Sequence, residues 1–158
     1  MSRVHQKPAD SGKQATQMSR AQVEAFFARR QEALDNLDTV ALSRDYAEDC
    51  VVDSPAGGGS LHGREEVERV RRKWFDSFPD LKFTTESMLI DGNHVVQITT
   101  MEGTDIGGFM GLAPKGKSFK VPAVYFYELR DGRIARERRI YDFTGMLVQV
   151  GAIKAKPV

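Results

Sequence analysis

The sequence has little cysteine, no long apolar run and almost no net charge. Its single cysteine, Cys50, excludes an internal disulfide and a metal site built from several cysteines, which fits a reducing compartment. No stretch approaches the ~20 apolar residues of a membrane span, and the N-terminus lacks the apolar core of a secretory signal. Lys plus Arg number 23 and Asp plus Glu 22, a balance that argues against nucleic acid. We therefore expect a cytoplasmic protein with a small-molecule ligand and with neither nucleic acid nor membrane as partner.

Bulky apolar side chains are scarce at the start of the chain. Residues 1–18 are rich in Lys, Gln and Ser, and they cannot bury enough surface to offset the entropy of ordering. We interpret residues 1–18 as a disordered N-terminal tail. Residues 19–158 then form a single domain, a length that suits one hydrophobic core.

Apolar residues recur every three or four positions in the first half of the domain, which predicts helices. Ser19 and Gln22 match a capping box, Asp38 can cap a second helix, and Pro79 ends a third. The predicted helices cover residues 21–36, 39–46 and 63–78, with a short strand at 50–53.

From Leu81 onwards the apolar period changes to two, which predicts strands. The predicted strands cover residues 81–90, 94–102, 119–129 and 133–141, and a final helical segment covers 143–150. Asp91-Gly92 and Asp131-Gly132 are the expected hairpin turns, because glycine supplies the positive φ that such turns need. Helices followed by a meander of strands predict an α+β fold, with three N-terminal helices packed on a curled, mainly antiparallel sheet.

A phosphate-binding motif, G-x-x-x-x-G-K-[ST], is matched letter for letter from Gly111 to Ser118. Such a loop binds phosphate only when a helix follows, because the phosphate lies against the free amides of the helix N-terminus. The residues from Phe119 to Tyr127 instead alternate at period two and include Pro122. We therefore predict a glycine-rich loop that enters a strand, and no nucleotide site.

Asp142 lies where the last strand meets the final helical segment. In an apolar pocket, desolvation would raise its pKa towards the range in which a carboxyl both takes and returns a proton near neutral pH. Aspartate is also a favoured helix cap, and the two roles are compatible. If Asp142 points inward, Ile140 and Arg138 share its face of the strand.

The strand at 119–129 has a nearly apolar face, which can form one wall of a hydrophobic pocket. On that face, Tyr125 is either a hydrogen-bond donor to a developing enolate oxygen or a core aromatic with a satisfied hydroxyl. Trp74 is either a core residue or part of the pocket lining. The other residues that we expect to line the pocket are Ser54, Phe109, Met110, Ala123, Tyr127 and Met146. The three histidines show no metal spacing, so we expect neither a metal nor another cofactor.

Four segments carry a family resemblance: WFDSFPDL from Trp74, GTDIGGFMG from Gly103, DGRI from Asp131 and YDFTGMLVQVG from Tyr141. With the order of elements, they resemble the SnoaL-like polyketide cyclases of the nuclear transport factor 2-like superfamily over residues 21–151. The resemblance implies a cone-shaped α+β barrel. It also implies a homodimer that pairs through the outer face of the sheet.

The same resemblance implies a chemistry. Family members with known activity close a polyketide ring by intramolecular aldol condensation without a cofactor, and the aspartate of the closing segment, which matches Asp142, acts as acid/base. The family pattern has a histidine at Tyr125, a glutamine at Ala123 and an asparagine near Ser54, and this sequence departs at all three. We hypothesise a cofactor-independent cyclase, isomerase or hydrolase acting on a small hydrophobic carbonyl compound, with Asp142 as acid/base and Tyr125 as donor. The alternative is a non-catalytic small-molecule-binding or dimerisation domain of the same fold.

Overall fold

A computed structural model describes residues 16–56 and 58–155. Most of the tail predicted at residues 1–18 lies outside the described residues, although Met18 is half-buried against the hydrophobic core. Among the described residues, no helix is both long and apolar enough to cross a membrane.

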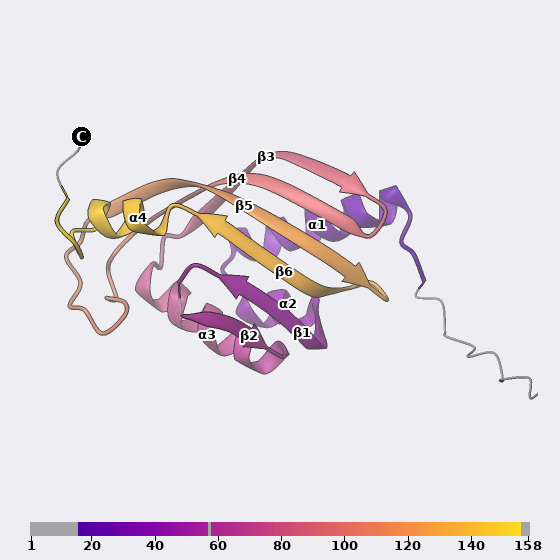
Figure 1. Cartoon of the computed structure of the whole chain (residues 1–158), viewed down its shortest axis with the longest axis horizontal. Helices are drawn as coiled ribbons and strands as arrows, with labels where there is room; N and C mark the ends of the chain where they lie inside the picture. The colour runs from indigo at the N-terminus through magenta and orange to yellow at the C-terminus, as the bar shows by residue number, and fades with distance from the viewer. Residues whose placement is uncertain (1–15, 57, 156–158) are drawn as a thin grey trace, which may run out of the picture.

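The predicted order of helices and strands is confirmed, with one added strand (Figure 1). The helices are α1 (Arg20–Asp35), α2 (Thr39–Arg44), α3 (Arg64–Ser77) and α4 (Phe143–Gln149). The strands are β1 (Tyr46–Ser54), β2 (Gly59–His62), β3 (Lys82–Asp91), β4 (His94–Thr104), β5 (Ser118–Arg130) and β6 (Arg133–Tyr141). Helix α2 ends earlier than predicted because the chain from Tyr46 onwards joins the sheet. Strand β2 was missed because its neighbouring glycines indicate a loop.

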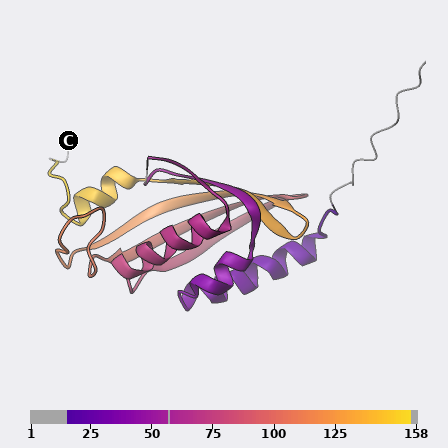
Figure 2. The ribbon, with the colours of Figure 1, turned by 90° about the horizontal axis from the view of Figure 1, so that it is seen from below.

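The six strands form one sheet in the order β2-β1-β6-β5-β4-β3. Every neighbouring pair is antiparallel except β1 and β6, which are parallel. Helices α1, α2 and α3 cover one side of the curled sheet, and α4 extends from its end (Figure 2). This confirms the predicted α+β fold, in which β2 and β3 remain as edges, so that the described sheet curls without closing.

Local capping signals fix where the helices begin. Ser19 accepts a hydrogen bond from the Gln22 amide at 3.2 Å and its own amide donates to the Gln22 side chain at 2.8 Å, which confirms the capping box. Asp38 accepts from the Ala41 amide at 2.9 Å at the start of α2. These predictions held because cap geometry depends on residues only three positions apart.

The loop between β4 and β5 is organised by Asp105, a buried carboxylate. Its side chain accepts hydrogen bonds from the amides of Gly108 and Lys115, each at 3.1 Å. Strand β5 begins at Ser118, directly after the glycine-rich motif. The prediction of a loop that enters a strand, without the helix that a phosphate site requires, is confirmed.

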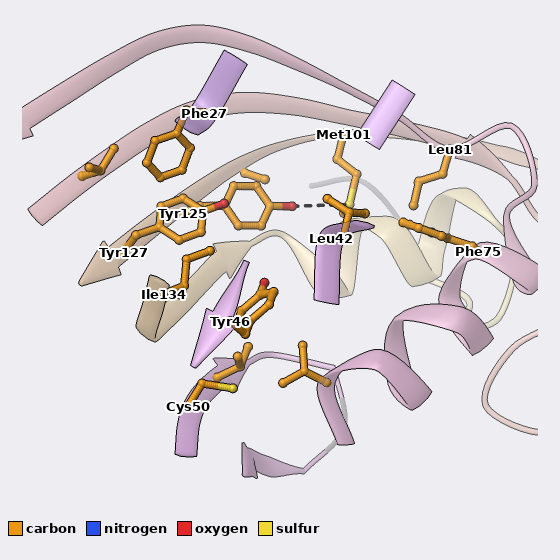
Figure 3. Packing of buried hydrophobic residues seen from close by; sticks show 14 of the residues in the cluster. Phe27, Leu42, Tyr46, Cys50, Phe75, Leu81, Met101, Tyr125, Tyr127 and Ile134 are labelled. Atoms are coloured by element: carbon orange, nitrogen blue, oxygen red, sulfur yellow. Dashed lines mark hydrogen bonds between the residues drawn. The ribbon is translucent and has the colours of Figure 1, made fainter. Parts of the chain in front are cut away.

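The core lies between the inner face of the sheet and the helices (Figure 3). Phe27 of α1 packs against Tyr127 of β5 with ring centroids 5.0 Å apart. Phe78, fully buried after α3, packs against Phe109 and Phe119 at 5.3 and 5.1 Å. These contacts fix α1 and α3 over β5 and leave a hollow between them.

Candidate functional site

A cavity lies between helices α1 and α3 and the inner face of β4, β5 and β6. It encloses about 70 Å³, and the hollow reaches about 730 Å³ when the part open to solvent is included. The lining residues are Arg30, Leu34, Ser54, Ala56, Val70, Arg71, Trp74, Phe75, Phe83, Thr85, Gln97, Thr99, Met101, Tyr125, Tyr127, Glu137, Arg139 and Tyr141. Aromatic and aliphatic walls with a few polar groups are typical of small-molecule sites.

An irregularity in β6 decides which of its side chains enter this cavity. Leu129 pairs with Ile134, but Glu128 pairs with Arg136, so that Ala135 is an extra residue in the β6 strand. Beyond this bulge, the register places Glu137, Arg139 and Tyr141 opposite Tyr127, Tyr125 and Ala123. Residues directly opposite each other share a face, so these three side chains join the inner face.

The residues of β6 that alternate with these three face outward. Ile140 is 59% exposed and the Arg138 side chain is 64% exposed. Arg138 and Ile140 were expected to face inward only if Asp142 does, and Asp142 is exposed as well. A shift of one residue in register exchanges the two faces of a strand, so the bulge decides that Arg138 and Ile140 face outward.

Glu137 is a buried carboxylate on the cavity wall, 2% exposed. It accepts hydrogen bonds from Arg139 Nε at 2.6 Å and from the Tyr46 hydroxyl. Burial by itself would raise the pKa of Glu137, but the charges of Arg139, Arg30 and Arg71 outweigh it and lower that pKa from 4.5 to about 2. Glu137 is therefore ionised at neutral pH.

Tyr46 joins the arginines to this carboxylate. Its hydroxyl accepts hydrogen bonds from Arg30 at 2.8 Å and from Arg71 at 2.6 Å. Arg30 also pairs with Asp45 at 3.1 Å. We call Tyr46, Glu137, Arg30, Arg71 and Arg139 the buried ionic cluster. Arg30, Arg71, Glu137 and Arg139 of this cluster place fixed charges in the lining of the cavity.

Tyr125 lies in the cavity wall beside this cluster. It is 8% exposed, and its hydroxyl lies 3.9 Å from the Met101 sulfur (Figure 3). A thioether is a weak acceptor, and no stronger partner lies within the described residues. Burial raises the pKa of Tyr125 above its ordinary value of 10, so the phenol keeps its proton. The hydroxyl is therefore available to donate a hydrogen bond to a ligand.

Asp142 is the N-cap of α4, and its Oδ1 accepts a hydrogen bond from the Gly145 amide at 2.7 Å. The residue is exposed and is not among the cavity-lining residues, although Tyr141 directly before it is. A Cβ at position 145 would overlap the Asp142 carboxylate, so glycine permits the cap. The predicted cap is confirmed, and the acid/base role stays a prediction.

The remaining predicted site residues divide into three groups. Ser54, Trp74 and Tyr127 line the cavity with Tyr125. Phe109, Ala123 and Met146 are buried in the core but are not among the lining residues. Met110 is 63% exposed in the loop between β4 and β5 and is likewise not among them. The structure thus brings together four of the predicted residues, from α3, β1 and β5, and leaves Ala123 and the predicted residues of the loop and of α4 outside the lining.

The sequence analysis missed the charged part of the lining. Arg30 follows Phe27 by three residues, and Arg71 follows Val67 by four, so both occupy apolar positions of their helices. An arginine at an apolar position of a helix could have been recognised in the sequence as a buried charge. The sequence did not indicate that Glu137 and Arg139 are buried, because β6 carries charged residues on both faces and only the bulge determines which face is turned inward.

No group of three or more His, Cys, Asp or Glu side chains within residues 16–56 and 58–155 is placed to hold a metal ion. The polar groups of the cavity are guanidinium, hydroxyl and amide groups together with one carboxylate. These groups suit an organic ligand with oxygen acceptors.

Comparison with known structures supports the fold. TsrD from Streptomyces laurentii aligns with a TM-score of 0.75 and 24% identity over 86% of this chain and 99% of its own. IdmH from Streptomyces antibioticus, proposed to be a polyketide cyclase, aligns with a TM-score of 0.68 and 29% identity over 81% and 97%. An NTF2-like protein from Burkholderia pseudomallei aligns with a TM-score of 0.71 and 19% identity over 84% and 98%. No curated protein was found to match the chain.

The family model described as SnoaL-like polyketide cyclase matches residues 14–150. That range includes all four helices and all six strands, and therefore every residue of the cavity wall. The chain, with its curled sheet and the cavity beneath it, belongs to the SnoaL-like polyketide cyclase family.

Proposed function

We propose that the cavity binds a small hydrophobic carbonyl compound and promotes cofactor-independent acid/base chemistry of the cyclase or isomerase type. The observation that carries the proposal is the Tyr125 hydroxyl, a buried donor in an aromatic cavity whose one acceptor among the described residues is a thioether sulfur. A donor in a poorly solvated site stabilises the negative charge that develops on an enolate oxygen. Isomerisation and aldol cyclisation both proceed through such an enolate.

The proton acceptor in this proposal is Asp142, as the family resemblance implies. Its carboxylate lies one residue beyond Tyr141, which lines the cavity, so a substrate would have to present its reacting carbon near the start of α4. Glu137 lies inside the cavity, but a carboxylate with a pKa of about 2 is a weak general base. Asp142 is therefore the better candidate for the base.

A second candidate function, non-catalytic binding of a hydrophobic metabolite, is favoured by the position of the same residue. The Asp142 carboxylate is exposed and engaged in capping α4. The carboxylate inside the cavity, Glu137, is held by arginines. A cavity that binds without moving a proton needs neither group as a base.

We expect Tyr125→Phe to lower proton abstraction from a ketone about 100-fold, because it removes one donor to the enolate oxygen. Asp142→Asn is expected to lower it about 100-fold or more, because asparagine cannot accept the proton. The measurement is deuterium exchange at the α-carbon of α-tetralone, a compact aryl ketone, followed by NMR.

Asp142→Asn is a sharp test because asparagine caps a helix about as well as aspartate, so stability is expected to stay within about 0.5 kcal/mol. Asp38→Asn, the same change at the cap of α2, is the matched control and should leave exchange unchanged. If wild type binds α-tetralone without accelerating exchange, the binding function replaces the enzymatic one. If Tyr125→Phe lowers the rate of exchange but Asp142→Asn leaves it unchanged, the base is another group.

We also propose a homodimer formed through the outer face of the sheet. Ile98 of β4, Phe126 of β5 and Ile140 of β6 are 40%, 40% and 59% exposed. Val124 pairs with both Ile98 and Ile140, so these strands present one apolar surface. Such a surface marks an interaction site.

Phe126→Glu is expected to weaken the dimer on the order of 100-fold, since both copies of the interface would then bury a charge. Sedimentation velocity across a dilution series measures the shift to monomer. Val40→Glu, an exposed apolar residue on α2, is the control and should not change the mass. A wild-type protein that sediments as a monomer throughout would contradict the dimer.

A further inference from the structure

The cavity wall carries more positive than negative charge. Three guanidinium groups line it, those of Arg30, Arg71 and Arg139, against the one carboxylate of Glu137. Arg139 pairs with Glu137 at 2.6 Å, and Arg30 pairs with Asp45 at 3.1 Å. Arg71 forms no ion pair with any described residue. The excess charge is therefore concentrated at Arg71.

Arg71 is also poorly satisfied as a hydrogen-bond donor. It is 8% exposed, one of its terminal nitrogens donates to the Tyr46 hydroxyl at 2.6 Å, and its Nε has no partner among the described residues. Burial and the charges of Arg30 and Arg139 lower the pKa of Arg71, although a guanidinium still keeps its proton. A buried cation that makes no direct ion pair costs stability, even though Glu137 acts on Arg71 from a distance. An anionic ligand would remove that cost.

Further polar groups line the same cavity. Thr99 Oγ1 is buried and has no partner among the described residues. Within the described part of the chain, the Tyr125 hydroxyl has only the Met101 sulfur as a partner. Gln97, which is 8% exposed, also lines the cavity. Buried polar groups are almost always hydrogen-bonded in folded proteins. Groups that lack a partner and face one cavity indicate a polar occupant.

The rest of the cavity determines what kind of anion fits. Apolar side chains of Val70, Trp74, Phe75 and Phe83 form other parts of the lining. A strongly hydrated inorganic anion would lose its water against these walls without compensation. An apolar molecule with one planar anionic group suits both the apolar lining and the arginine, since a carboxylate accepts two parallel hydrogen bonds from a guanidinium.

We infer that the ligand of this cavity is a hydrophobic carboxylic acid, with its carboxylate bound by Arg71 and its apolar part against Trp74 and Phe83. The inference rests on the proposed function only in using the same cavity as the ligand site. It requires no turnover. It adds a substrate class to that site, because the carbonyl compound would carry a free carboxylate.

The test compares benzoate and phenylacetate with their uncharged counterparts, methyl benzoate and phenylacetamide. We expect the carboxylates to bind wild type at least 10-fold more tightly, measured by titration in ¹H–¹⁵N NMR spectra. Arg71→Gln is expected to abolish this preference. Arg29→Gln also removes one arginine charge next to the cluster, but Arg29 does not line the cavity, so this control should keep the preference.

Stability gives a second readout that a purely structural arginine would not produce. Arg71→Met removes a buried cation that makes no direct ion pair with a described residue, so we expect an unchanged or higher Tm without ligand and no further rise with benzoate. If Arg71 merely supports the fold, its replacement lowers the Tm instead. If neither variant folds, the Arg71 Nε–Hε resonance of wild type supplies the result: it should shift on adding benzoate but not on adding sodium sulfate.

Three results would overturn the inference: equal affinity for acid and ester, a preference that survives Arg71→Gln, or an equal shift with sulfate. Equal affinity for acid and ester would leave the proposed carbonyl-binding function standing. Failure of all four organic probes to bind would instead count against both. Binding of carboxylates without deuterium exchange of α-tetralone would remove the enzymatic proposal alone.

Discussion

Replacing Glu137 by glutamine is expected to destabilise the protein by about 3–5 kcal/mol, because it removes one partner of a buried ion pair. Glu137 is the buried counter-charge to Arg139, and its charge also acts on Arg30 and Arg71. Without it, three guanidinium groups remain on the cavity wall with no carboxylate among the cavity-lining residues. Urea denaturation at neutral pH measures the loss.

The pH dependence of stability tests the same interaction without a mutation. The pKa of Glu137 is about 2 in the folded protein and 4.5 ordinarily, so its contribution is fully present above about pH 4.5. As pH falls from about 4.5 to 2, about 3 kcal/mol of stability is expected to be lost. Glu137→Gln should be insensitive to this part of the titration.

Glu102→Gln is the matched control for this experiment. Glu102 pairs with Lys120 at 3.4 Å, and both side chains are exposed, so its loss should cost less than about 1 kcal/mol. If Glu137→Gln and Glu102→Gln lose similar amounts of stability at neutral pH, the central role of Glu137 is contradicted. The same loss of stability on acidification in wild type and in Glu137→Gln would also contradict it.

Gly107→Ala is expected to cost about 3 kcal/mol, or a fall in Tm of roughly 6–12 °C. A Cβ at this position would overlap the carbonyl oxygen of Asp76 near the end of α3. The amides of Ile106 and Gly107 both donate to the Ser77 carbonyl at 3.1 Å, so the loop cannot retreat without breaking these bonds. Differential scanning calorimetry gives the Tm.

Gly111→Ala, in the same loop, separates crowding from backbone strain. No atom lies within 4 Å of a Cβ placed there, but its φ is +73°, so only the left-handed backbone opposes the change. We expect a cost of about 1 kcal/mol. If Gly107→Ala and Gly111→Ala lower the stability by the same amount, close packing against α3 is not the reason for glycine at position 107.

The family and the α+β fold were predictable from the sequence. Tyr125, Tyr127, Trp74 and Ser54 lie in the lining of the cavity, and their role in ligand binding stays a prediction. Their placement followed from the alternation of β5 and the helical spacing of α3, which are properties of single elements. Asp142 was predicted both as a cap and as an acid/base, and its cap role was readable because capping depends on residues three positions away.

The sequence by itself determined the order of elements, the helix caps, the inner face of β5 and the rejection of the phosphate loop. Each depends on residues near one another in the chain. The tertiary structure alone decided which half of β6 faces the cavity, because a single extra residue at Ala135 reverses the faces of the strand beyond it. That one bulge places Glu137 and Arg139 inside and leaves Ile140 outside, and therefore sets the charge of the cavity.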